Sequence, residues 1–219
     1  MQVMQGENRT RLSDSALPAP VTPASPRLIW LFAGVALVVC AVDQATKVWA
    51  LTALSDGAPR EVIGSFLRLY LVRNPGAAFS LGTGSTWVLT VLAAVVLVVL
   101  VRASRRLGSL GWAWAFGLVL GGALGNLTDR LIRDPGFGVG HVVDFIDYNG
   151  WFVGNVADIA IVGAALLIGL LAIRGVGIDG RREGQAEGSN GITRSEHIAT
   201  EEAGEGGIPA ATEGTDRDG

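Results

Sequence analysis

The sequence predicts an all-α integral membrane protein with four transmembrane helices and a small extracytoplasmic β element. Hydrophobic residues make up 49% of its 219 residues, and mean hydropathy is +0.42. Four segments contain no Asp, Glu, Lys or Arg: 28–42, 74–101, 107–128 and 159–173. About 20 mostly apolar residues cross a bilayer as a helix, so the second and third segments suffice by themselves. The first and fourth reach this length only by including charged residues.

The two ends of the chain have the composition of unfolded segments. Residues 175–219 hold ten acidic residues and four arginines, a local charge of −6, and they are rich in Gly and Glu. Such a segment buries too little apolar surface to fold, and four prolines give the N-terminal segment a similar character. We therefore expect a disordered segment at 1–26, a membrane domain at 27–174 and a disordered tail at 175–219.

Positive charges at the ends of the apolar segments predict their orientation. We place the four spans at about 28–50, 84–102, 108–131 and 152–174. Arginines occur before the first span, between the second and third, and after the fourth: Arg27, Arg102, Arg105, Arg106, Arg174, Arg181 and Arg182. Short flanks rich in Lys and Arg face the cytoplasm. Both termini are therefore predicted to be cytoplasmic.

The segment between the first two spans then faces outward and contains strand and turn signals. Phe66, Arg68 and Tyr70 alternate with leucines, and this period of two is typical of a strand. Asn-Pro-Gly at residues 74–76 is turn chemistry. We expect a small sheet at the outer membrane surface, with an outer loop between the third and fourth spans.

Ionisable side chains in or beside the predicted spans gather at one depth. Each costs about 2.5–3.5 kcal/mol at a helix centre on insertion scales, so their placement indicates a role. Spans one and three run outward, and span four begins outside. This topology brings six residues near the outer face: Asp43, Lys47, Asp129, Arg130, Asp144 and Asp158.

Helical spacing favours a structural role for some of these residues. Asp43 and Lys47 are four apart and can pair on one helical face. Asn126 and Arg130 are also four apart, and they form one polar stripe with Asp129. Ion pairs inside a protein usually serve architecture, and polar groups join helices in membranes. We therefore interpret the two pairs as connections between helices.

Asp144 and Asp158 differ, because neither has a basic residue within four positions apart from His141. Two neighbouring carboxylates can share one proton. The ionised group then takes a proton from water while the neutral group donates one to a carbonyl oxygen. This pair can hydrolyse a peptide bond. Two histidines and one cysteine in the whole chain suggest no other hydrolytic apparatus, and we expect no metal and no cofactor.

Four blocks of sequence, in order, carry a resemblance to a known family. They are Asp43-Gln44-x-x-Lys47, the segment RNPGAAFS at 73–80, the segment GGALGNLTDR at 121–130, and VVDF at 142–145 followed by NVAD at 155–158. Together they resemble the lipoprotein signal peptidases, or signal peptidase II. One departure is Gly154, where the family usually has Phe; here Phe152 stands two positions earlier.

The resemblance implies an intramembrane aspartyl endopeptidase that removes the signal peptide from diacylglyceryl-modified prolipoproteins, cutting before the lipidated cysteine. It implies that Asp144 and Asp158 are the catalytic pair. Substrate-binding or supporting roles fall to Asp43, Lys47, Asn74, Gly122, Asn126, Asp129, Arg130, Asn155 and Ala157. The implied partners are lipid-modified prolipoproteins and membrane lipid, with no nucleic acid. The implied location is the bacterial cytoplasmic (inner) membrane, with the active site near its extracytoplasmic face.

Several alternatives remain open at this point. Intramembrane charges also mark ion paths, although four spans without an internal repeat are less typical of a transporter. The charges can instead join helices of a non-catalytic scaffold. A different class of intramembrane aspartyl protease would carry a GxGD signature, which the chain lacks. The glycines of the third block leave room either for a neighbouring helix or for a ligand.

Overall fold

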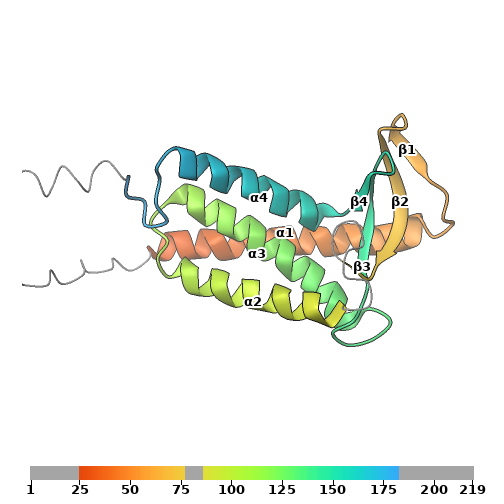
Figure 1. Cartoon of the computed structure of the whole chain (residues 1–219), viewed down its shortest axis with the longest axis horizontal. Coiled ribbons are helices and arrows are strands. Elements are labelled where there is room, and N and C mark those ends of the chain that lie inside the picture. Colours follow the sequence, from red (N-terminus) through yellow and green to blue (C-terminus); the bar gives the residue numbers. More distant parts are fainter. Residues whose placement is uncertain (1–24, 77–85, 183–219) are drawn as a thin grey trace, which may run out of the picture.

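The computed structural model describes residues 25–76 and 86–182, and within them four long helices carry a small sheet at one end (Figure 1). The helices are α1 (Pro26–Ala53), α2 (Thr86–Ser104), α3 (Leu110–Ile132) and α4 (Val156–Ile173). Each is long and apolar enough to cross a membrane. The predicted fold class is confirmed.

The fourth helix begins later than the sequence predicts. Residues 152–154 form a strand, and Asn155 is the N-cap of α4, so the helix starts at 156 and not at 152. The Asn155 side chain accepts a hydrogen bond from the Asp158 backbone N–H, and the Asp158 side chain accepts one from the Asn155 backbone N–H. This capping box satisfies two backbone donors that the first turn of a helix otherwise leaves without partners.

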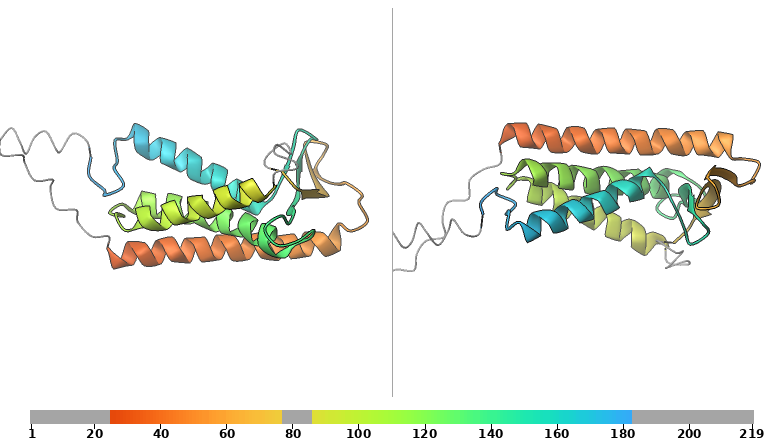
Figure 2. Two further views of the ribbon diagram at one scale, coloured as in Figure 1. Left: turned by 60° about the horizontal axis from the view of Figure 1, so that its bottom comes forward. Right: turned by 90° about the horizontal axis from the view of Figure 1, so that it is seen from above.

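Helix α3 is the central helix of the bundle. It packs against each of the other three helices, with α1 on one side and α2 and α4 on the other (Figure 2). Half of the residues in the most apolar part of α3 are buried, whereas in the other three helices the corresponding share is 11–22%. The outward faces of α1, α2 and α4 are apolar and exposed, as expected for helices that contact lipid.

Glycines allow α3 to approach its neighbours closely. A Cβ atom at Gly121 would lie 2.6 Å from the Ala36 carbonyl oxygen of α1. One at Gly122 would lie 2.7 Å from the Ala157 carbonyl oxygen of α4. A side chain at either position would push the helices apart, so these two glycines serve helix packing and not a ligand.

The sheet contains four antiparallel strands in the order β1-β2-β3-β4. They are β1 (Arg60–Ile63), β2 (Leu67–Asn74), β3 (Val142–Tyr148) and β4 (Phe152–Gly154). The strand predicted around residues 66–71 is confirmed as β2. The region between spans three and four, predicted as a loop, contains β3 and β4. One face of β3 packs on the end of α1, through Val143 and Phe145 against Ala50 and Leu54.

Part of the predicted C-terminal tail packs against the bundle. The Ile178 carbonyl oxygen accepts a hydrogen bond from Gly108 N, and the Val176 carbonyl oxygen accepts one from Trp112 Nε1 at 2.8 Å. Ile178 joins the apolar core near Leu107. Folded structure therefore continues beyond the predicted boundary at 174, while residues 1–24 and 183–219 lie outside the described residues.

Candidate active site between the helices and the sheet

Two groups of carboxylates lie at the end of the bundle that carries the sheet, near the start of α4. The first group contains Asp43 of α1 and Asp129 of α3, both fully buried. The second contains Asp144 of β3, which is 2% exposed, and Asp158 in the first turn of α4. The six charged residues that the topology places at one depth thus lie at one end of the fold.

Lys47 neutralises much of the first group. Its Nζ lies 2.8 Å from Asp43 Oδ2 and 2.9 Å from Asp129 Oδ2, and it donates a hydrogen bond to Asn126 Oδ1 at 2.8 Å. These three acceptors match the three N–H groups of an ammonium ion. The predicted Asp43–Lys47 pair is confirmed as part of a connection between α1 and α3.

Arg133 and Gln44 complete this network, and the sequence interpretation missed both. Arg133 Nε lies 2.6 Å from Asp129 Oδ1. Gln44 Nε2 donates to the Gly125 carbonyl oxygen at 3.0 Å and lies 3.2 Å from both Asp43 Oδ2 and Asp129 Oδ1. The i,i+4 spacing of Asp129 and Arg133 is a signal that could have revealed the second cation. Two carboxylates and two cations leave the network without net charge.

Arg130 does not pair within its own helix as the spacing predicts. Its Nη2 donates to the Gly76 carbonyl oxygen at 2.6 Å, and its Nη1 lies 3.5 Å from the Pro75 carbonyl oxygen. Arg130 therefore holds the turn that follows β2. That turn is also closed locally, because the Gly76 backbone N–H donates to Asn74 Oδ1 at 2.9 Å, as the Asn-Pro-Gly sequence predicts.

The carboxylates of the second group accept hydrogen bonds from amides. Asp144 Oδ1 accepts from Asn155 Nδ2 at 2.6 Å, and Asp144 Oδ2 accepts from Asn74 Nδ2 at 2.9 Å. Asp158 Oδ1 accepts from Asn126 Nδ2 at 3.1 Å, and Asp158 Oδ2 accepts from the Asn155 backbone N–H at 3.1 Å. Across residues 25–76 and 86–182, neither carboxylate forms a salt bridge. Asn155 thus orients both members of the pair.

Burial raises the pKa of Asp144 to about 6. The hydrogen bond from Asn74 lowers this pKa, and the nearby negative charge of Asp158 raises it again. A carboxyl group with a raised pKa keeps its proton at higher pH than an ordinary Asp does, as suits the protonated member of a pair that shares one proton.

Both carboxylates line one small cavity of about 80 Å³. Its other lining residues include Asn74, Asn126 and Arg130. Because one water molecule occupies about 30 Å³ of liquid, the cavity has room for water beside a reacting group. The arrangement therefore offers two acid–base groups, several amide donors and a guanidinium around one enclosed space.

An apolar groove of about 660 Å³ runs along α4 to this cavity. Its lining includes Ile159, Val162 and Leu166. Phe152 and Asp158 line both the groove and the cavity. An apolar molecule in the groove would therefore reach the Asp158 carboxylate.

The Phe152 ring occupies the space beside Gly154. A Cβ atom at Gly154 would lie 2.6 Å from Phe152 Cε1 and 2.9 Å from Asp158 Oδ2. Glycine at 154 thus leaves room for the aromatic ring next to the carboxylate. This arrangement accounts for the shifted position of Phe relative to the usual family pattern.

Ala157 and Gly122 lie behind the cavity. The Ala157 backbone N–H donates to Asp43 Oδ1 at 3.0 Å, and the Ala157 side chain is fully buried. Gly122 faces the Ala157 carbonyl group and Ile161. These two small residues join α4 to α1 and α3. Gly122 does not line the cavity.

Comparisons with known proteins give the relatives of this chain. The family described as signal peptidase (SPase) II matches residues 35–174. The chain is similar to proteins named lipoprotein signal peptidase from Rhodococcus jostii, with 49% identity over 78% of this chain and 85% of the relative. The protein of that name from Mycobacterium tuberculosis is 48% identical over 74% of this chain and 82% of the relative.

Two solved structures, both described as bacterial membrane enzymes, share the fold. One has a TM-score of 0.59 at 31% identity, covering 66% of this chain and 88% of the other. The second has a TM-score of 0.57 at 28% identity, covering 71% of this chain and 98% of the other.

Proposed function

The chain belongs to the signal peptidase II family of membrane proteases, and we propose that Asp144 and Asp158 are its two catalytic carboxylates. One observation carries the proposal. Two carboxylates from different elements line the same cavity, and their hydrogen bonds come from amides. A neutralising cation would favour the ionised form of both carboxylates. Amide donors carry no charge, so they allow the pair to hold one proton.

The proposed reaction needs one ionised and one protonated carboxyl group. The ionised carboxylate takes a proton from water as the water oxygen attacks the scissile carbonyl carbon. The protonated partner donates its proton to the carbonyl oxygen, which gives a neutral tetrahedral intermediate. The intermediate then breaks its C–N bond: the leaving nitrogen receives a proton from the pair, and one hydroxyl group of the intermediate returns a proton to the pair as its C=O bond forms. The enzyme ends with one proton shared between the two carboxylates, as it began.

Neighbouring residues would position the catalytic pair. Asn155 contacts Asp144 through its side chain and Asp158 through its backbone. Asn74 fixes the second oxygen of Asp144. Arg130 holds the turn that carries Asn74, and its guanidinium also lines the cavity. These groups supply the preorganised polar surroundings that lower the barrier in hydrolytic sites.

The substrates we propose are prolipoproteins that carry a diacylglyceryl group, cut just before the lipidated cysteine. The names of the relatives support the class of substrate. The apolar groove along α4 supports it independently, because a lipid chain or an apolar signal segment would bury hydrocarbon there and end beside Asp158.

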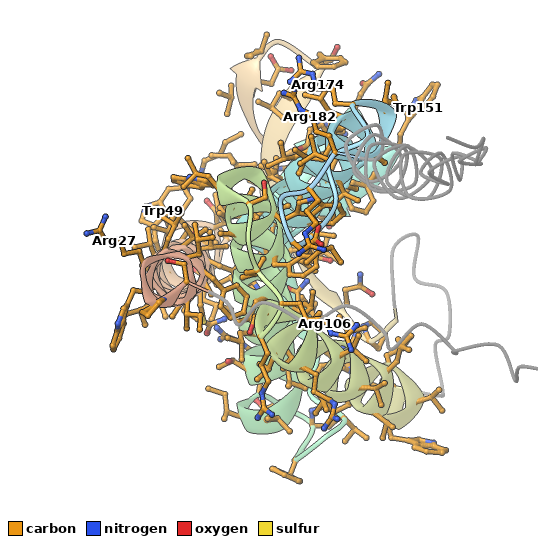
Figure 3. All side chains as sticks on the ribbon, turned by 90° about the vertical axis from the view of Figure 1, so that its left-hand side faces the viewer. Arg27, Trp49, Arg106, Trp151, Arg174 and Arg182 are labelled. Carbon is orange, nitrogen blue, oxygen red and sulfur yellow. The ribbon has the colours of Figure 1, made fainter. Side chains whose placement is uncertain are left out.

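We also propose that the active site lies at the extracytoplasmic face and that both termini are cytoplasmic. Figure 3 views the bundle from the end opposite the sheet, with Arg27 beside α1, Arg106 beside the α2–α3 connection and Arg174 beside the end of α4. All three are exposed, and arginines on short flanks favour the cytoplasmic side. Reporter fusions after Arg105 and Arg174 should read cytoplasmic, and one near Asp56 extracytoplasmic.

The proposed activity is tested with purified full-length protein and a diacylglyceryl-modified prolipoprotein. Mass spectrometry should show loss of the signal peptide, with a new N-terminus at the lipidated cysteine. The same prolipoprotein without its lipid is the matched control and should be cut far more slowly. Equal cleavage of both forms would contradict the lipid requirement. Absence of cleavage by well-folded protein would favour the transporter or scaffold interpretation.

A further inference from the structure

A second cavity, of about 200 Å³, lies on the opposite face of the sheet from the catalytic cavity. Arg73 of β2 pairs in register with Val143 of β3, and both line this second cavity. Their chain neighbours Asn74 and Asp144 line the first one. Successive side chains of a strand point to opposite faces, so the two cavities are separate sites on the two sides of β2 and β3.

Two guanidinium groups line the second cavity, and Arg133 is already paired with Asp129. Its polar walls are Arg73, Arg133, His141 and one carboxylate, Asp134. In the part of the chain that the structure describes, Arg73 forms no ion pair. Arg133 uses Nε for Asp129, and its Nη2 lies 3.5 Å from Gln44 Oε1. Because a guanidinium carries five N–H groups, Arg133 still has most of its donors available for a ligand.

Apolar residues from the ends of two helices stand beside these cations. Leu51, in the last turn of α1, and Ile132, the last residue of α3, line the cavity. Ile132 is 73% exposed. Val48, one helical turn before Leu51 in α1, is 58% exposed. Both helices are long and apolar enough to span the membrane. The cavity therefore combines anion-binding groups with a surface that faces lipid chains.

We propose that this second cavity binds the headgroup of an anionic phospholipid. The phosphate lies between Arg73 and Arg133, which offer the forked donors that suit phosphate oxygens. The acyl chains follow the exposed apolar surface near Val48 and Ile132. A soluble phosphate would use the cations but not this apolar surface, and the free charge of Arg73 favours a lipid with net negative charge.

The proposal is tested by titrating delipidated, full-length protein with phosphatidylglycerol and counting bound lipids by native mass spectrometry. Phosphatidylcholine is the comparison lipid. Arg73→Gln should weaken phosphatidylglycerol binding about tenfold, since a charge-assisted hydrogen bond is lost. Arg73→Lys keeps the charge and should retain most of the affinity. Arg60→Gln removes an exposed arginine from the same sheet and should leave binding unchanged.

Each outcome decides for or against the site. Equal weakening by Arg73→Gln and Arg60→Gln, or equal affinity for the two lipids, would overturn it in favour of diffuse surface attraction. Binding of inorganic phosphate as tightly as phosphatidylglycerol would overturn the assignment to a lipid. If Arg73→Gln does not fold, His141→Gln on the neighbouring wall carries the same test. None of these readouts depends on cleavage, so they stand apart from the proposed activity.

Discussion

Two pairs of carboxylates lie at the same end of this bundle, and they have different bonding partners. Asp43 and Asp129 are fully buried and share Lys47, with Arg133 as a second cation on Asp129. Asp144 and Asp158 accept hydrogen bonds from asparagine amides and a backbone N–H. The first network has balanced charge, whereas the second leaves two acidic groups around a cavity.

The difference separates an architectural use of buried charge from a chemical one. A buried carboxylate that is paired with a cation forms a fixed connection between elements. A buried carboxylate with amide partners is oriented but can still be protonated. The chain uses the first arrangement to join α1, α3 and α4 and, as we propose, the second to hydrolyse a peptide bond.

The largest expected effect comes from removing one member of the second group. Asp144→Asn or Asp158→Asn should each lower kcat/KM by about a thousandfold or more, because each leaves only one of the acid and base roles. The double variant should be no worse than either single one. Cleavage of the lipidated prolipoprotein, followed by mass spectrometry, measures all three.

A matched control for these variants is Asp147→Asn, in the same strand as Asp144. Asp147 is buried but pairs with Arg68 at 2.6 Å, and it does not line the cavity. It should keep most of the activity. Substantial turnover by folded Asp144→Asn would contradict the aspartyl mechanism and leave the four-helix membrane fold intact.

The next largest effect concerns the ion-paired network of Asp43, Asp129 and Lys47, and we expect it in the free energy of unfolding. Lys47→Met leaves Asp43 and Asp129 with one cation fewer, and breaking a buried ion pair in this way costs about 3–5 kcal/mol. Unfolding in mixed micelles with increasing SDS measures the loss. Adding Asp43→Asn should recover part of it, because the double variant restores the charge balance. Arg60→Met, which removes an exposed ion pair, should change stability far less, because exposed ion pairs contribute little.

The four helices and the convergence of charged residues could be predicted because both follow from simple constraints. Helix length in a membrane is fixed by bilayer thickness, and chain direction alternates with each span. Asp43, Asp129 and Asp158 therefore had to meet at one end. The Asp43–Lys47 pair follows from their spacing of four residues on one helix.

The contacts made across the fold could not be predicted in the same way. The side of β3 that carries Asp144 depends on strand register, and a shift of one residue would turn it to the other face. Arg130 reaches the turn after β2, a segment more than 50 positions earlier. Such long-range contacts depend on how α3 packs against the sheet, and a local sequence pattern does not predict this packing.

A third prediction uses pH to separate Asp144 from the ion-paired carboxylates. Its pKa is about 6, above its ordinary value of 3.8, because of burial. A raised pKa in the folded state means that this group's stabilising contribution is present below pH 3.8 and is lost as pH rises to about 6. The difference of about two pKa units corresponds to roughly 3 kcal/mol.

Asp144→Asn cannot lose a proton at this position. Its free energy of unfolding, relative to the wild type, should therefore rise by up to about 3 kcal/mol between pH 3.5 and pH 7. SDS unfolding at several pH values measures the difference. A relative stability of Asp144→Asn that does not change with pH would show that Asp144 titrates normally.

The smallest effect concerns Asn126, the residue that touches both groups. Its Oδ1 accepts from Lys47 Nζ at 2.8 Å, and its Nδ2 donates to Asp158 Oδ1 at 3.1 Å. Asn126→Ala should lower kcat by about tenfold to a hundredfold through the lost bond to Asp158, which corresponds to about 1–3 kcal/mol. KM should change little, because Asn126 does not line the apolar groove.

Thr128→Ala provides the control, since the Thr128 hydroxyl bonds the Leu124 carbonyl oxygen within its own helix at 2.8 Å. Steady-state kinetics with the lipidated substrate would separate kcat from KM. If Asn126 acts through Asp158, its effect should vanish in the Asp158→Asn background, because residues that act as a unit are not additive. A fall in stability with unchanged kcat would instead assign Asn126 to the ion-paired network alone. The two carboxylate groups would then be neighbours without a functional connection through this amide.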